Sequence, residues 1–165
     1  MEKLDEKNCI ILNLLQENCR ISLTNIAKKV NLSVDSVKKR INKMIKKEIF
    51  YPKIQIRPRS LGFNNIVDIK IKVHNCNNQE LEKFIEYLKK HPRIAEVFSV
   101  SGAWNFSIVL IAKDYKDLGE ISTSIRNKFS KIINGWSESL TTTAYKFENY
   151  DLLKLMKIQE DKKNE

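Results

Sequence analysis

The fold of the N-terminal part is decided by residues 22–47, which read SLTNIAKKVNLSVDSVKKRINKMIKK. The spacing of the apolar residues predicts a short helix over residues 22–29, a three-residue turn, and a longer helix over residues 33–47. The expected buried faces are formed by Leu23, Ile26, Ala27 and Val30 in the first helix and by Val34, Val37, Ile41, Met44 and Ile45 in the second. The hydroxyls of Ser22 and Ser33 can each cap a helix start. Two helices joined by so short a turn predict a helix-turn-helix, whose second helix enters the major groove of DNA.

The longer helix is strongly basic on the face opposite its apolar residues, which carries Lys38, Lys39, Arg40, Lys43, Lys46 and Lys47. Because the N-terminal half of a recognition helix meets base edges, base contacts are expected from Ser33, Asp35, Ser36, Lys39, Arg40 and Lys43. Phosphate contacts are expected from Lys28, Lys29, Lys46, Lys47, Lys53 and Arg57. The expected partner is therefore double-stranded DNA. For any single lysine the alternative is a solvated side chain, and Arg20 and Arg40 could instead tie helices together.

The composition supports a polyanion-binding module joined to a second part. The chain has 165 residues, 42% of them hydrophobic, and a formal net charge of +10. Residues 1–60 hold 14 Lys and Arg against 6 Asp and Glu, whereas residues 61–165 hold 16 against 14. A solvated lysine-rich surface would not explain why the excess gathers in one part.

The three cysteines, Cys9, Cys19 and Cys76, include no C-x-x-C pair, which argues against a disulfide framework and against structural zinc. No catalytic spacing surrounds His74 or His91, so we expect neither an enzyme nor a cofactor. No apolar run resembles a signal peptide or a membrane span, which favours a cytoplasmic location.

The residues before the helix-turn-helix predict a first helix over residues 4–17, capped by Asp5. Alternation over residues 50–56 predicts a strand, so the first domain is expected to be of the winged helix-turn-helix type. Proline and glycine then mark a linker. The predicted organisation is a DNA-binding domain at 1–50, a linker at 51–65, a second domain at 66–147 and a C-terminal tail at 148–165.

The second domain is predicted to be a ferredoxin-like βαββαβ unit, which makes the whole chain α+β. Strands are expected over residues 67–73, 94–100, 106–112 and 136–145. Two helices are indicated by helical spacing of apolar residues, at Leu81, Phe84, Ile85 and Leu88 and at Leu118, Ile121, Ile125 and Phe129.

The strand at residues 106–112 is apolar on both faces, with Val109 and Ile111 on the side that two helices would leave open. We expect the same sheet of a second copy to cover this face, in a symmetric homodimer that could extend to a tetramer or octamer. The alternative cover is the C-terminal segment, through Leu152, Leu153, Leu155 and Met156. Residues 160–165 are predicted to be disordered.

Several short motifs, in this order, resemble the Lrp/AsnC (leucine-responsive, or feast/famine) family of transcriptional regulators. They are Leu4-Asp5, Ile11-Leu12, Asn18-Cys19-Arg20-Ile21, Leu32-Ser33, Val37-Lys38-Lys39-Arg40-Ile41, Leu61-Gly62-Phe63, Gly102-Ala103-Trp104-Asn105 and Thr141-x-Thr143. The resemblance implies a sequence-specific DNA-binding regulator that forms dimers or larger assemblies. It also implies that the second domain senses a small molecule, commonly an amino acid, at the turn formed by Ser101, Gly102, Ala103, Trp104 and Asn105.

Three positions depart from the family pattern. Asn31 and Glu48 stand where glycine is usual, and we expect the turn at Asn31 to survive but the helix to end differently at Glu48. Asn105 stands where an acid is usual, and its amide lacks the charge that could pair with an amino group. This points to a different effector, or to an ordinary turn with Trp104 packed as core.

Two other functions remain open from the sequence. Sirohaem decarboxylases of haem biosynthesis share this layout, but they need His and Arg around a tetrapyrrole, and the strands beside Gly102 carry no His. A co-regulator that acts through mixed assemblies with its relatives would depend less on its own DNA contacts.

Overall fold

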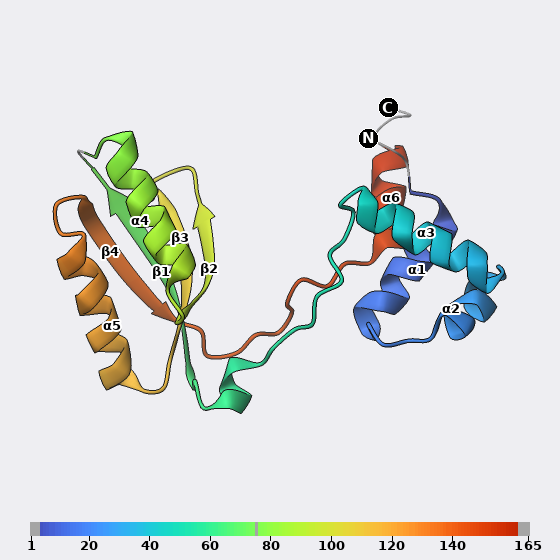
Figure 1. The fold of residues 1–165 in the computed structure, drawn as a ribbon, viewed down its shortest axis with the longest axis horizontal. Helices are drawn as coiled ribbons and strands as arrows, with labels where there is room; N and C mark the ends of the chain where they lie inside the picture. The colour runs from blue at the N-terminus through green and yellow to red at the C-terminus, as the bar shows by residue number, and fades with distance from the viewer. Residues whose placement is uncertain (1–3, 75, 162–165) are drawn as a thin grey trace. The chain divides into compact units, whose positions relative to one another are not determined.

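The chain was analysed as a computed structural model that describes residues 4–74 and 76–161 (Figure 1). These residues form two compact units. The N-terminal unit combines the residues up to Gln55 with those from Lys146 onward, and the sheet unit is Ile56–Tyr145. The units therefore divide the predicted linker between them and join the C-terminal segment to the N-terminal unit. No helix in the described ranges is long and apolar enough to cross a membrane.

The N-terminal unit contains helices α1 (Glu6–Glu17), α2 (Leu23–Val30), α3 (Val34–Lys46) and α6 (Leu152–Asp161). The predicted caps are confirmed: Asp5, Ser22 and Ser33 each accept a hydrogen bond from the backbone N–H three residues on. The helix-turn-helix is therefore confirmed. The core of the unit is formed by Ile11, Leu12, Leu14, Ile26, Ala27, Val30, Val37 and Met44. Val34 and Ile45, which were expected in this core, are instead 40% and 37% exposed.

Two left-handed residues end the helices of this motif. Asn31, at φ 50°, follows α2 as expected, and the Leu32 N–H donates to the Ala27 carbonyl at 3.1 Å. Glu48 is also left-handed, at φ 54°, so the expectation that α3 ends differently without glycine is wrong. Donation from the Glu48 N–H to Ile45 (2.9 Å) and from the Ile49 N–H to Met44 (3.0 Å) satisfies the last carbonyls. These two hydrogen bonds oppose the steric cost of the Glu48 conformation.

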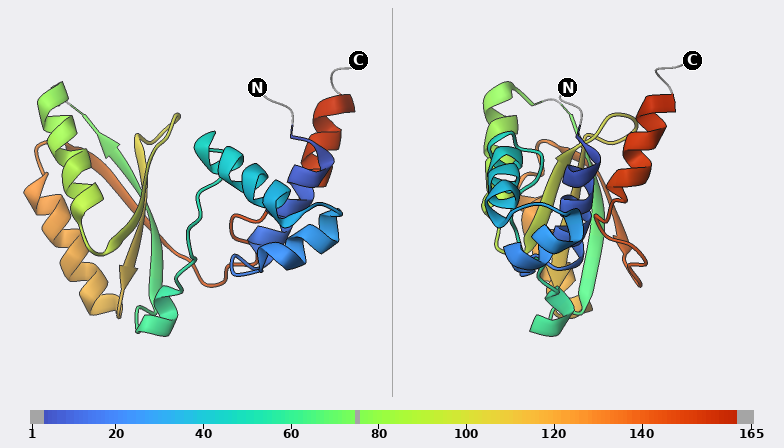
Figure 2. Two further views of the ribbon diagram at one scale, coloured as in Figure 1. Left: turned by 45° about the vertical axis from the view of Figure 1, so that its right-hand side comes forward. Right: turned by 90° about the vertical axis from the view of Figure 1, so that its right-hand side faces the viewer.

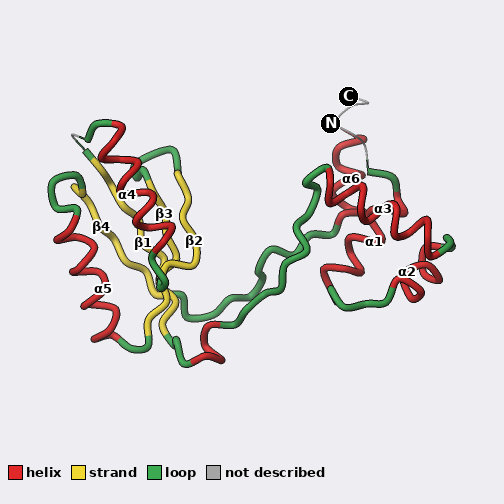
Figure 3. The backbone as a smooth tube through the Cα atoms, in the orientation of Figure 1, coloured by secondary structure: helices red, strands yellow, loops and turns green. Residues whose placement is uncertain are grey.

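The prediction of a strand over residues 50–56 is wrong, because this segment is a loop (Figure 3). Alternation alone does not make a strand, which also needs a partner for its backbone groups. The Lys53 N–H instead donates to the Tyr51 carbonyl at 2.8 Å, and Pro52 has no N–H to offer. The described part of the chain thus contains no strand in the position of a wing.

The sheet unit has the predicted βαββαβ order. Its strands are β1 (Asn65–Val73), β2 (Ile94–Ser99), β3 (Phe106–Ala112) and β4 (Ile133–Leu140), in the antiparallel order β2-β3-β1-β4. Helices α4 (Asn78–Lys90) and α5 (Tyr115–Lys128) lie on one face of this sheet (Figure 2). Strand β4 begins three residues earlier than predicted and ends at Leu140 rather than 145. The single turn η1 (Pro58–Leu61) precedes β1.

The two faces of the sheet differ in composition. The face covered by α4 and α5 carries the buried core, including Val67, Ile69, Ile71, Phe106, Ile108 and Leu110. The other face, called the open face below, carries Ile66, Val109, Ile111 and Phe98 together with polar residues such as Lys70, whose ammonium donates to Ser107 at 2.7 Å. Phe98 is 50% exposed. Apolar side chains therefore remain on the open face within the sheet unit.

The C-terminal segment returns to α1. The side chain of Gln16 both donates to the Tyr150 carbonyl and accepts from the Tyr150 N–H, each at 2.9 Å. The Leu152 N–H donates to Asn13 Oδ1 at 3.0 Å, and Leu152 packs against the core of the N-terminal unit. The alternative in which this segment covers the sheet is therefore wrong. The predicted disorder is wrong for residues 160 and 161, which belong to α6, and residues 162–165 lie outside the described residues.

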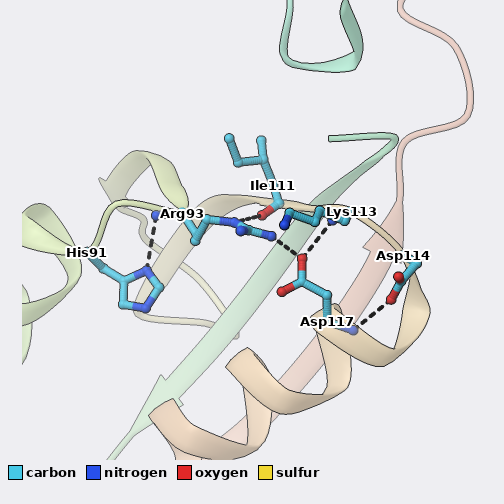
Figure 4. A network of polar contacts seen from close by, with 6 residues as sticks. All are labelled: His91, Arg93, Ile111, Lys113, Asp114 and Asp117. Carbon is cyan, nitrogen blue, oxygen red and sulfur yellow. Dashed lines mark hydrogen bonds and ion pairs between the residues drawn. The ribbon is translucent and has the colours of Figure 1, made fainter. Parts of the chain in front are cut away.

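A polar network around Arg93 joins the start of α5 to the edge of the sheet (Figure 4). The Arg93 guanidinium donates to the Ile111 carbonyl (2.9 Å) and to the carboxylate of Asp117, and it lies 4.5 Å from the ring centre of Phe63. The Lys113 N–H also donates to Asp117. This backbone hydrogen bond, with Arg93, lowers the pKa of Asp117 against the opposing effect of burial. The network fixes the β3–α5 connection.

Candidate nucleic-acid interface and effector turn

Helix α3 carries an exposed row of lysines, called the basic ridge below, formed by Lys38, Lys39, Lys43, Lys46 and Lys47. Val37 and Met44, on the opposite side, are 0% and 2% exposed and hold the helix to the core. Because residues four apart share a helix face, Lys39, Lys43 and Lys47 lie in one line. The apolar anchor thus turns a line of positive charge outward.

The start of α3 presents Ser33, Asp35 and Ser36. The Ser33 hydroxyl accepts from the Ser36 N–H (3.2 Å) and donates to Ser36 Oγ (2.8 Å), so the cap already uses it. The Ser36 hydroxyl keeps its own proton for an outside acceptor. Asp35 is exposed in the first turn, where its charge also favours the helix dipole.

Arg40 is drawn away from the basic ridge toward α1. Its guanidinium donates to Asp5 Oδ2 at 2.6 Å and to Asn8 Oδ1 at 2.9 Å. Burial of Asp5 works to raise the pKa of its carboxyl, but hydrogen bonds from Arg40 and from the Asn8 backbone, with the charge of Arg40, lower that pKa overall. This geometry favours the structural alternative for Arg40 over base contact.

A cleft runs along α3 beside the start of α1. Its lining residues are Asp5, Asn8, Ser36, Lys39, Arg40, Lys43, Met44, Lys47 and Ile49. Sequence reasoning missed Asn8, because its partner Arg40 is 32 residues away and no local pattern links the two.

The remaining predicted phosphate contacts are exposed but less closely grouped. Lys28 and Lys29 occupy the last turn of α2, where cations also favour the helix dipole. Lys53 lies 5.2 Å from the ring centre of Tyr51 in the loop after α3. Arg57 belongs to the sheet unit, and Arg20 is exposed in the turn between α1 and α2.

In the sheet unit, the turn of residues 101–105 is pinned to β1. The Asn105 N–H donates to the Ile71 carbonyl (3.0 Å), and the Asn105 carbonyl accepts from the Val100 N–H (2.9 Å). The Asn105 side-chain oxygen accepts from the Val73 N–H at 2.9 Å. Ser101, Gly102 and Ala103 are exposed, and Gly102 is required by its φ of 122°.

Trp104 lies across β4 at Gly135. A Cβ on Gly135 would lie 3.0 Å from the Trp104 ring and 3.0 Å from the Cβ of Lys72. Lys72 pairs with Gly135 and points to the face opposite the buried Ile71. Trp104 is therefore half-buried against the backbone of β4 on the open face, and it is not part of the core beneath the helices.

The two histidines lie at the ends of α4 and β1. His91 is half-buried at the end of α4, and burial together with the charge of Arg93 lowers its pKa. His74 is exposed at the end of β1. Within residues 4–74 and 76–161 no group of three or more His, Cys, Asp or Glu side chains could hold a metal ion.

Comparison with known proteins accounts for both units. The AsnC-type helix-turn-helix domain matches residues 4–45, and the Lrp/AsnC ligand binding domain matches residues 66–135. The HTH-type transcriptional regulator LrpA of Pyrococcus horikoshii is 32% identical over 130 residues, which cover 78% of this chain and 88% of the relative. The chain belongs to the Lrp/AsnC family. It is thus a DNA-binding transcriptional regulator with a ligand-binding domain, and relatives of this kind are regulators rather than enzymes.

Solved structures of transcriptional regulators share the fold. A transcriptional regulator of Neisseria meningitidis in complex with L-Met superposes with a TM-score of 0.83 at 18% identity, covering 93% of this chain and 99% of that one. E. coli AsnC gives a TM-score of 0.78 at 16% identity, covering 91% and 99%. The confirmed assignment leaves the sirohaem decarboxylase alternative without support.

Proposed function

We propose that α3 reads DNA in the major groove, with the basic ridge on the phosphates beside it. The observation that carries this proposal is the line of exposed Lys39, Lys43 and Lys47 opposite the buried Val37 and Met44. Ser36 and Asp35, at the start of the helix, are the proposed base readers. Lys28, Lys29, Lys38 and Lys46 add phosphate contacts that set affinity but not sequence. Residues 1–50 would thus form the DNA-binding domain.

We further propose that the regulator acts in the cytoplasm as a homodimer through the open face of the sheet, within a domain spanning residues 66–147. The support is apolar surface at Ile66, Val109, Ile111 and Phe98, on the face away from α4 and α5. The same face of a second copy is self-complementary under a two-fold axis. A dimer would present two copies of α3 to a roughly palindromic site.

We also propose the turn of residues 101–105 as the place where a small-molecule effector binds. Its exposed backbone around Gly102 permits close approach, and Trp104 offers an apolar surface. Binding of L-Met by the Neisseria meningitidis regulator makes amino acids the first compounds to test.

The experiment is a gel shift with the pure protein and the DNA upstream of its own gene, over a range of salt concentrations. Lys39→Ala and Lys43→Ala should each weaken binding and reduce the log–log salt slope by about 0.9 per lost phosphate contact. Lys116→Ala, an exposed lysine on α5, is the matched control. Binding that ignores salt and both substitutions would exclude α3 as the reader, and failure of the pure protein to bind would favour the co-regulator alternative.

A further inference from the structure

The turn of residues 101–105, called the effector turn below, and the adjoining end of β1 bring three side chains together: Asn105, Lys72 and Trp104. Asn105 reaches the backbone of β1 at Val73, directly after Lys72. The Cβ of Lys72 and the Trp104 ring both approach Gly135, each within 3.0 Å of the place a Cβ would take there. The Asn105 amide, the base of the Lys72 side chain and the Trp104 indole thus lie around one corner of the open face.

The Val73 N–H fixes which way the Asn105 amide faces. A backbone N–H can only donate, so its partner at 2.9 Å must be the amide oxygen. The amide NH2 therefore points away from Val73. In the described part of the chain this NH2 group has no hydrogen-bond partner, which leaves two donor hydrogens for a ligand. An aspartate could keep the bond to Val73 with one oxygen and would present its second, negative oxygen instead.

Lys72 and the turn of residues 101–105 carry one positive charge and several hydrogen-bond donors. Lys72 is exposed, and within residues 4–74 and 76–161 its ammonium makes no ion pair. The turn itself contains no carboxylate. The ammonium group of an amino acid would therefore meet Lys72 without a neutralising partner. A carboxylate would find both the Lys72 charge and the Asn105 donors.

Resting on the proposed effector turn, we infer that this site selects a small 2-oxo acid over the corresponding amino acid. The ligand carboxylate pairs with Lys72, its 2-oxo oxygen accepts from the Asn105 amide, and its side chain lies on Trp104. A 2-oxo acid and the corresponding amino acid differ only at C2. The 2-oxo acid presents a ketone oxygen that accepts a hydrogen bond, whereas the amino acid presents a positively charged ammonium group.

The test is isothermal titration calorimetry of the full chain with leucine, methionine and phenylalanine, each beside its 2-oxo acid. We expect at least one 2-oxo acid to bind about tenfold or more tightly than its amino acid, which is about the effect of one hydrogen bond between neutral groups. Asn105→Asp should reverse that preference, and Lys72→Met should weaken 2-oxo acid binding. Asn127→Asp makes the same charge change on exposed α5 and should alter neither.

Three results would overturn the inference, each read with circular dichroism to confirm that the variants fold. Amino acids that bind as tightly as their 2-oxo acids would refute the selectivity but leave the effector turn in place. An unchanged preference in Asn105→Asp would refute the role of the amide. No heat of binding for any of the six compounds would refute both the effector turn and this inference, whereas the DNA proposal would stand on its separate gel shift.

Discussion

Replacing Glu48 by glycine should stabilise the N-terminal unit. Glu48 holds φ 54° at the end of α3, where its N–H and that of Ile49 satisfy the last carbonyls of the helix. A left-handed conformation costs an L-residue roughly 1–2 kcal/mol. Glycine removes that cost but adds about 0.5–1 kcal/mol of backbone entropy to the unfolded chain. Subtracting the middle of the second range from the middle of the first leaves a net gain of roughly 0.5–1 kcal/mol.

Differential scanning calorimetry of the full chain measures this gain. For a unit of this size it corresponds to a rise in melting temperature of about 2 to 8 °C. Glu48→Ala is the matched control, because it removes the same charge from the C-terminal end of α3 but keeps the Cβ. If Glu48→Gly is no more stable than Glu48→Ala, the steric reasoning is refuted.

Three further predictions concern contacts in the two units. Gln16→Ala removes both hydrogen bonds to Tyr150, so hydrogen exchange of residues 150–157 should become faster than in Glu17→Ala, and equal rates would exclude the contact. The lowered pKa of Asp5 means that its ion pair stabilises the protein above about pH 4, its unfolded value, and that this contribution is lost as pH falls through the folded pKa. The Asp5 side chain is 52% exposed, so the free energy of unfolding of Asp5→Asn should lie no more than about 1 kcal/mol below that of the parent near neutral pH. In an acid titration this difference should shrink only below about pH 4. Gly135→Ala places a Cβ against the Trp104 ring, so it should lower the free energy of unfolding by about 1–3 kcal/mol. It should also shift the tryptophan emission of Trp136→Phe protein, in which Trp104 is the one tryptophan, and unchanged emission would contradict the packing.

The helix-turn-helix could be predicted because its signals are local. The apolar period of α3 and the hydroxyl of Ser33 both lie within a few residues of the structure they determine. The βαββαβ order of elements in the second domain followed from strand and helix patterns of the same kind. Residues 50–56 show the limit, since their alternation is real but the described chain supplies no strand to pair with them.

Contacts between distant residues could not be predicted. The apolar residues of α6 would look the same whether they met the sheet or α1, and only the fold shows Leu152 against the core of the N-terminal unit. Likewise, the position of Arg40 on a basic helix predicts a contact with DNA. The structure instead places its guanidinium 2.6 Å from Oδ2 of Asp5, which lies 35 positions earlier in the chain. The conformation of Glu48 was missed for another reason: hydrogen bonds of the helix end outweigh the steric preference of one residue.

The return of the C-terminal segment to α1 changes how the protein should be dissected. A fragment that stops at Gln55 contains every residue of the helix-turn-helix. It would nevertheless expose the apolar surface that Leu152 covers, and the side chains of Asn13 and Gln16 would lose their hydrogen bonds to the C-terminal segment. Such a fragment is expected to be less stable and more prone to aggregation than the intact protein. Weak DNA binding by this fragment would then reflect its lower stability and not the properties of α3. A minimal DNA-binding protein should therefore include residues 146–161, joined to the fragment by a linker.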